Sequence, residues 1–259
     1  MRFTPFDFDV ITSPPADPER QAMPPAPLRL LSTLGLQGAL QARAAALADA
    51  LGGPIATEFA PTKLLLERLA GGEAADLVIL TDAAVADLTR EGKLAPGAVP
   101  LAASLVGLAQ APGRVRPDIA TPEALVTTLR AARSIAYSAA GASGLYFAAL
   151  LERLGIAAEI NAKAQIVPSG LTGALVARGE TEYAVQQLSE LALVDGIEIL
   201  GPLPAALQTP TVFTVAATPG AGPAASRLLA LLAGADMARA LAASGLEPLH
   251  GLARRDGSG

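Results

Sequence analysis

The chain repeats one local pattern: a short apolar strand, a turn of small polar residues, and then a helix. The clearest example runs over 134–155, where an apolar strand and a Ser/Ala/Gly turn precede a helical segment that ends at Gly155. The apolar residues of this segment recur at i, i+3, i+4 and i+7, the spacing of one helix face: Phe147, Leu150, Leu151 and Leu154. A chain built from such units is largely restricted to α/β folds with parallel strands.

Three more such units follow one another in the first third of the chain. Their predicted strands cover 28–32, 55–59 and 76–80, and each strand is followed by a helical pattern. Thr81 and Asp82 are expected to cap the third helix. Successive strand–helix units predict a parallel sheet with helices on both faces. Further strands and two closing helices are predicted over 164–167, 182–185, 197–200, 222–233 and 236–244.

Two apolar segments, Leu101–Ala109 and Thr211–Ala216, are predicted to be strands that cross between two lobes. The predicted fold class is therefore α/β, with two α/β lobes joined by two crossing strands. Lobe I is predicted over 28–104 plus 212–252, and lobe II over 105–211. Two crossings form a hinge, and a ligand is expected in the cleft between the lobes.

Composition argues against several classes of function. The 259 residues carry a formal net charge of −5 without a basic block, which argues against a nucleic-acid-binding protein. Cysteine is absent, which excludes disulfides and thiolate chemistry. The single histidine, His250, lies near the C-terminus, so no Ser/His/Asp triad is expected. We find no metal-ligand cluster, Walker loop or nucleophile motif, so neither a metal nor a cofactor is expected.

The two ends of the chain are predicted to lie outside the lobes. Residues 1–27 contain prolines and acidic residues and are interpreted as an extended or disordered arm, and 253–259 as a disordered tail. The arm has no apolar run of the length of a signal-peptide core, and no segment has the pattern of a transmembrane helix. For a full-length chain, the sequence therefore predicts a cytoplasmic protein without membrane insertion. We also expect a monomer.

Small polar residues gather where the predicted strands end, which is where α/β sheets bind ligands. Neutral donors at positive helix ends suit a small anion, which is the predicted partner. The hydroxyls of lobe I have the competing interpretation of helix caps, and Lys63 that of a solvated surface charge. Alternation places Gln186 and Gln187 on opposite faces, so only one is expected to reach the cleft. The predicted ligand-binding residues are Ser32, Thr33, Thr62, Lys63, Ser104, Ser138, Ser143, Gly144, Gln186 and Gln187.

Six motifs follow one another over nearly all of 28–250. They are LRLLST at 28–33, FAPT at 59–62, GEAADLVIL at 72–80, RPDIATPEAL at 116–125, YSAAGASG at 137–144 and LVARGE at 175–180. In this order and spacing they resemble the molybdate-binding-protein-like branch of the type 2 periplasmic solute-binding proteins. The resemblance implies a two-lobed periplasmic-binding-protein-like fold that closes on a small anion. It also implies a periplasmic location and delivery of the anion to an ABC importer permease.

Two segments depart from the molybdate-binding pattern. VQQLSEL at 185–191 and GPLP at 201–204 are similar to a side branch that includes aconitate isomerase and handles di- or tricarboxylates. Two functions therefore stay open. The favoured one is a binding protein for a small oxyanion or organic carboxylate, because no catalytic base is evident. The alternative is an isomerase of a small unsaturated di- or tricarboxylate, which needs a proton-transfer group; Glu190, Tyr146 and Lys63 are its candidates.

Overall fold

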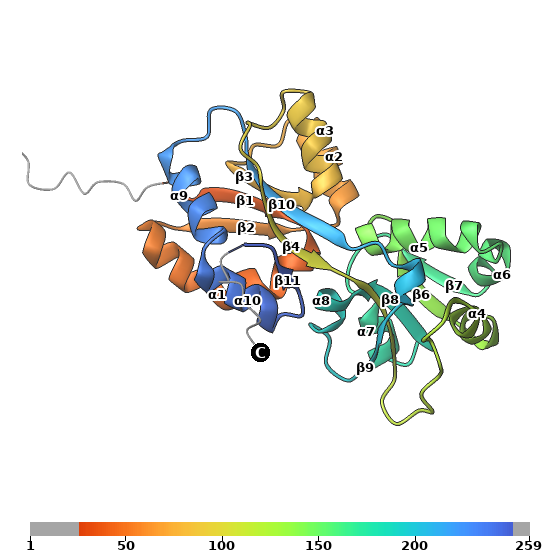
Figure 1. Cartoon of the computed structure of the whole chain (residues 1–259). Helices are drawn as coiled ribbons and strands as arrows, with labels where there is room; N and C mark the ends of the chain where they lie inside the picture. The colour runs from red at the N-terminus through yellow and green to blue at the C-terminus, as the bar shows by residue number, and fades with distance from the viewer. Residues whose placement is uncertain (1–25, 251–259) are drawn as a thin grey trace, which may run out of the picture.

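The computed structural model describes residues 26–250 and contains two β-sheets, each packed between helices (Figure 1). The first sheet has six strands in the order β11-β4-β10-β3-β1-β2. Its strands are β1 (Leu28–Ser32), β2 (Ile55–Phe59), β3 (Leu77–Thr81), β4 (Val99–Ser104), β10 (Thr211–Ala217) and β11 (Glu247–Pro248). Most of the predicted arm, and all of the predicted tail over 253–259, lie outside the described residues.

Alternating apolar side chains place a core on each face of the first sheet. Leu28 and Leu30 belong to the core under α1, α9 and α10, whereas Leu31 belongs to the core under α2 and α3. The continuous apolar run of β3 fits a strand that is buried on both faces. The helices around this sheet are η1 (Leu34–Leu36), α1 (Gln37–Leu51), α2 (Thr62–Ala70), α3 (Asp82–Arg90), α9 (Pro223–Leu232) and α10 (Ala235–Ala243).

The second sheet has five strands in the order β7-β6-β8-β5-β9. Its strands are β5 (Val106–Gln110), β6 (Ile135–Ser138), β7 (Ala164–Val167), β8 (Tyr183–Gln187) and β9 (Glu198–Pro202). The helices around it are α4 (Pro122–Ala131), α5 (Ala142–Arg153), α6 (Ala157–Asn161), α7 (Gly173–Ala177), α8 (Leu188–Leu191) and η2 (Ala205–Leu207). One core lies under α4, α5 and α6, and the other under α7 and α8. Within residues 26–250, none of the helices has the length and apolarity that crossing a membrane requires.

The chain passes between the two sheets twice. β4 and β5 are separated only by Leu105, so the first crossing is one nearly continuous extended segment (Figure 1). The return runs from β9 through 203–210 into β10, which pairs antiparallel with β3 and β4. The fold is thus the predicted two-lobed α/β fold. We use lobe I for the part built on the first sheet and lobe II for the part built on the second; the residue boundaries given above stay a prediction.

The strand–helix pattern predicts the parallel part of each sheet and misses the rest. β1 pairs parallel with β2 and β3, and β6 pairs parallel with β7 and β8. The crossing strands join antiparallel, because a strand that leaves one lobe and a strand that returns to it run in opposite directions. α6, α8 and β11 were not predicted, because the two helices span little more than one turn each and β11 has only two residues.

The predicted cap at 81–82 is wrong. The side chain of Thr81 makes no hydrogen bond to α3, and Asp82 Oδ1 instead accepts a hydrogen bond of 2.8 Å from Thr214 Oγ1. Thr214 lies on β10, so the aspartate links α3 to a strand that is distant in sequence. A local pattern cannot reveal such a partner, whereas it does reveal a partner within one helical turn.

Candidate functional site

Turns from both lobes meet at one place, which we call the lobe junction. It consists of the turns after β1, β2, β6 and β8, the helix α8, and the crossing between β4 and β5. Across it, the N–H group of Lys63 donates to the carbonyl oxygen of Ala140 at 3.4 Å. α8 of lobe II packs against η1 and α1 of lobe I. A Cβ atom at Gly38 on α1 would lie only 2.9 Å from Leu193 Cδ2, so the lobes are in close contact here.

The lobe I side of the junction is lined with hydroxyl groups. Ser32, Thr33 and Thr62 are buried. Ser32 Oγ donates to the carbonyl oxygen of Thr33 at 3.0 Å, and the N–H of Thr33 donates to the carbonyl oxygen of Ile79 at 3.0 Å. Thr33 and Thr62 make no side-chain cap to η1 or α2, so the helix-cap interpretation is not supported at these positions.

Lys63 presents its backbone, rather than its side chain, to lobe II. Its side chain is exposed, while its N–H group makes the contact with Ala140. This arrangement favours the interpretation of Lys63 as a solvated charge. The N-cap positions of α2 and α5, Pro61 and Gly141, supply no side-chain cap to the first N–H groups of these helices.

The predicted residues after β6 build a tight turn. Ser138 Oγ accepts hydrogen bonds from the N–H groups of Ala140 at 3.2 Å and Gly141 at 2.9 Å, as serine commonly does in turns. Ser143 is buried in the first turn of α5. A Cβ atom at Gly144 would lie 1.8 Å from the carbonyl oxygen of Ser138, so only glycine lets α5 approach β6 this closely. The packing therefore explains Gly144 without a ligand.

Ser104 and Gln187 meet at the crossing. Ser104 on β4 is the register partner of Thr211 on β10, and Gln187 Nε2 donates to Thr211 Oγ1 at 2.9 Å. This hydrogen bond joins lobe II to lobe I. Ser104 also lines a cavity of about 110 Å³ between the lobes, together with Leu188 and Pro210.

Gln186 points the other way, as alternation predicts. Its Oε1 accepts from the N–H of Thr172 at 2.8 Å and from Thr172 Oγ1 at 3.0 Å, and its Nε2 donates to the carbonyl oxygen of Gly170 at 3.2 Å. The amide is thus committed to the loop between β7 and α7. We infer that Gln186 holds the site together and that Gln187 is the glutamine at the lobe contact.

Glu190 on α8 is the one charged side chain that is buried in the described part of the chain. Burial raises the pKa of the Glu190 carboxyl to about 7, and a hydrogen bond with the Gln186 side chain acts in the opposite direction. No charged side chain within 26–250 contributes to this shift. A carboxyl with such a pKa is close to half-ionised near neutral pH, which suits it to accept and return protons.

Several buried polar atoms at the lobe junction have no hydrogen-bond partner among the described residues. They are Thr62 Oγ1, Ser104 Oγ, Gln187 Oε1 and Ser189 Oγ. Buried polar groups are almost always hydrogen-bonded, and leaving one without a partner costs free energy. Four of the eight such atoms in the described part of the chain lie here, which favours a site that is completed by a polar ligand.

Tyr146, the third proton-transfer candidate, packs against the core under α4 and α5, and its buried hydroxyl has no partner among the described residues. His250, for which no triad was expected, is exposed near β11. Sequence reasoning missed Thr172, Ser189 and Thr211, which contact the predicted residues or lie beside them. The signal that could have found them is the same one used elsewhere, namely a small polar residue next to a strand end.

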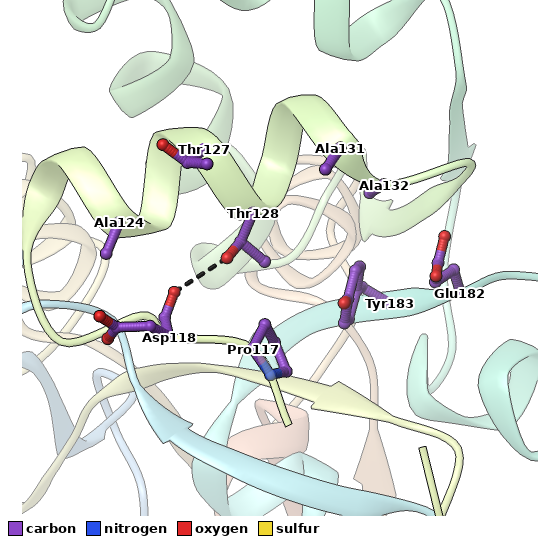
Figure 2. A pocket seen from close by; sticks show the side chains of 9 residues that line it. All are labelled: Pro117, Asp118, Ala124, Thr127, Thr128, Ala131, Ala132, Glu182 and Tyr183. Carbon is purple, nitrogen blue, oxygen red and sulfur yellow. Dashed lines mark hydrogen bonds between the residues drawn. The ribbon is translucent and has the colours of Figure 1, made fainter. Parts of the chain in front are cut away.

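A separate cavity of about 540 Å³ lies on lobe II and contains none of the predicted site residues. Figure 2 shows that α4 forms one wall and that Pro117, Glu182 and Tyr183 lie opposite. Tyr183 begins β8, whereas the lobe junction lies at the end of β8. Glu182 is held by the N–H of Arg133 at 2.7 Å and by an ion pair with Arg114. The carboxylate in this cavity therefore already has partners, in contrast to Glu190.

The junction combines neutral hydrogen-bond donors with α8, the short helix that carries the protonatable carboxyl of Glu190. Hydroxyl, amide and backbone N–H donors can hold a small anion without a buried cation. Such a site selects by shape and hydrogen-bond count, and the carboxyl adds the capacity for proton transfer.

Comparison with known proteins shows the relationship of the chain. The model of the family described as bacterial extracellular solute-binding protein matches residues 28–247. An aconitate isomerase of Pseudomonas sp. is 36% identical over 237 residues, which cover 88% of this chain and 90% of that protein.

Solved structures show the same fold at low sequence identity. The periplasmic molybdate-binding protein of Azotobacter vinelandii has a TM-score of 0.71 at 18% identity, covering 85% of this chain and 98% of that one. Peb3 of Campylobacter jejuni, solved with L-phospholactate bound, has a TM-score of 0.64 at 15% identity, covering 85% and 99%. At these identities the likeness establishes the two-lobed fold alone.

Proposed function

Because this chain belongs to the bacterial extracellular solute-binding protein family, we propose that it binds a small organic carboxylate at the lobe junction and isomerises it. The substrate class is an unsaturated di- or tricarboxylate such as aconitate. The observation that carries the proposal is the 36% identity to an aconitate isomerase over nearly the full length of both chains. The segment VQQLSEL at 185–191, which set the chain apart from the molybdate-binding pattern, contains the buried Glu190.

The proposed reaction moves a double bond by one carbon. A base removes a proton from the methylene carbon between a carboxylate and the double bond, and the C–H electron pair is delocalised into an enolate-like anion. Return of a proton to the former alkene carbon completes the shift without oxidant or cofactor. The site must therefore supply one base and several donors for the developing charge. The unpartnered hydroxyls of Thr62, Ser104 and Ser189 are suited to the second task.

The experiment is an incubation of the purified protein with trans-aconitate in deuterium oxide, followed by proton NMR. We expect resonances of the cis isomer to appear and the methylene signal to decrease as deuterium enters. Heat-denatured protein and citrate, which has no double bond, are the controls. Binding of aconitate without isomerisation or exchange would refute the isomerase and leave a receptor.

A receptor for a small anion is the second candidate function. The neutral hydroxyls that have no partner among the described residues favour it, since they could hold an anion and binding alone needs no base. The family also favours it, because its description is that of extracellular solute-binding proteins. Such a receptor would deliver its anion to an ABC importer. The cytoplasmic location predicted above depends on residues 1–25, which lie outside the described part of the chain.

A thermal-shift screen separates the ligand classes, with molybdate, tungstate, sulfate, citrate and both aconitates. A ligand at 100 times its Kd stabilises the folded protein by about 2.7 kcal/mol. Stabilisation by aconitate and not by molybdate supports the organic-anion proposal, and the reverse result contradicts it.

A further inference from the structure

We propose that Glu190 is the residue that transfers the proton in this reaction, with Gln186 as the residue that positions it; this inference rests on the proposed function. Among the described residues, every other charged side chain lies in a partly or fully exposed residue, and only Glu190 is buried.

The position of Glu190 is the first support. It lies on α8, directly after the end of β8, and α8 packs against η1 and α1 of lobe I. Ser189, its neighbour, has a buried hydroxyl without a partner among the described residues. The carboxyl therefore belongs to the same short helix that carries lobe II to the junction.

The lack of a structural partner is the second support. Glu182, the comparison within lobe II, is bound by the N–H of Arg133 and by the Arg114 side chain. For Glu190, the Gln186 side chain is the one hydrogen-bonding group among the described residues that affects its ionisation, and no charged group among them does so. A buried carboxyl that is not neutralised by a cation is costly, and such groups cluster at functional sites.

Gln186 is suited to fix the carboxyl. Its Oε1 accepts two hydrogen bonds from Thr172, and its Nε2 donates to the carbonyl oxygen of Gly170. The amide is thereby held in one orientation, with its NH₂ group directed to acceptors. A side chain held in this way can keep Glu190 in place during a proton transfer.

The proton and the electrons of this step are exchanged only between the substrate and the Glu190 carboxyl. The Glu190 carboxylate takes the proton from the allylic methylene carbon, and the electron pair of that C–H bond becomes part of the delocalised anion. The carboxylic acid of Glu190 then gives a proton to the other end of the allyl system. The double bond has moved, and Glu190 is again a carboxylate.

The test compares the kinetics of the wild type, Glu190→Gln and Glu67→Gln with trans-aconitate in deuterium oxide. For E190Q we expect kcat to fall at least about 100-fold, the usual scale for loss of a general base, and KM to change less than threefold. Deuterium incorporation should fall with kcat. E67Q, which neutralises an exposed carboxylate on α2, should keep kcat within threefold. For Gln186→Leu we expect a smaller loss of kcat and a displaced pH optimum.

The outcomes separate this inference from the proposed function. A wild type that binds but does not isomerise refutes both the isomerase and the role of Glu190. An active wild type with an E190Q variant of similar kcat refutes the role of Glu190 alone. If circular dichroism shows that E190Q does not fold, Glu190→Asp replaces it. If the kcat of E190D is at least tenfold below that of the wild type and deuterium exchange into the substrate is still detected, the role of Glu190 is supported. An E190D variant with an unchanged kcat refutes it.

Discussion

The buried carboxyl of Glu190 should make the stability of this protein depend on pH in a way that one substitution removes. The pKa of Glu190 is raised to about 7 in the folded protein by burial, against an ordinary value of 4.5. Between these two values the folded state binds more protons than the unfolded state, so the free energy of unfolding falls as the pH rises. The contribution is fully present below about pH 4.5 and is lost as the pH passes 7.

The magnitude follows from the two pKa values. Each factor of ten in proton affinity corresponds to about 1.4 kcal/mol, so the raised pKa corresponds to a loss of about 3 kcal/mol between pH 4.5 and pH 8. Glutamine has nearly the shape of glutamic acid and stays neutral. We therefore expect Glu190→Gln to gain about 3 kcal/mol relative to the wild type over this range, with little difference near pH 4.5.

The assay is urea denaturation at several pH values, followed by circular dichroism, for wild type, E190Q and Glu67→Gln. Glu67 is exposed on α2, so its substitution should give a curve nearly parallel to that of the wild type. Other titrating groups are shared by all three proteins and cancel in the differences. Parallel curves for wild type and E190Q would refute the argument, because they would mean that Glu190 ionises as readily in the folded as in the unfolded chain.

Three further predictions test the packing and the donors of the lobe junction. Gly144→Ala should destabilise the protein by about 3 kcal/mol in urea denaturation, because the new Cβ would lie 1.8 Å from a carbonyl oxygen of β6. Gly222→Ala is the control: a Cβ at Gly222 would lie in open space, so the urea midpoint should change little. Thr62→Val should weaken aconitate binding, measured by calorimetry, by about 1 kcal/mol. Thr181→Val, which removes a buried hydroxyl that also lacks a partner among the described residues, should leave the affinity unchanged. Equal effects of the two substitutions would contradict a ligand contact at Thr62. Lys63→Met should cost less than about 1 kcal/mol of binding at 0.15 M salt, because its side chain is exposed, and a tenfold or larger rise in Kd would place this cation in the site.

The buried carboxyl of Glu190 lowers the stability of the protein, and the packing of the fold does not require a carboxyl at this position. Glutamine would fill the same space without the loss of stability above pH 5. Natural proteins commonly give up stability at sites where function needs a particular group. The pH dependence of stability and the kinetics of E190Q therefore test one idea by two independent measurements.

Much of the fold follows from local patterns. The strands over 28–32 and 55–59 were predicted to the residue, because a short apolar or alternating run between turn signals needs no distant partner to be recognised. The cap of α4 is of the same local kind: the N–H of Ala124 donates to Thr121 Oγ1 at 3.2 Å, within one helical turn. The crossing between the lobes followed from the length of one apolar run.

Part of the candidate site followed from the sequence in the same way. Small polar residues at strand ends mark the edge of a parallel sheet, so Ser32, Thr62 and Ser138 could be grouped before their positions were known. Alternation along β8 predicts that Gln186 and Gln187 point to opposite faces, and their side chains bond to different partners, Thr172 and Thr211.

Only the tertiary structure decided how the polar side chains at the strand ends lie relative to segments that are distant in sequence. The sequence could not show that Glu190 is buried beside Gln186 or that Gln187 bonds Thr211 across the lobes, because residues remote in sequence make these contacts. A propensity is a property of a few neighbouring residues, whereas burial, and the pKa that burial sets, depend on every element packed around a side chain. The sequence therefore determined where small polar residues follow the strands, and the packing of the chain determined which carboxyl is buried without a charged partner.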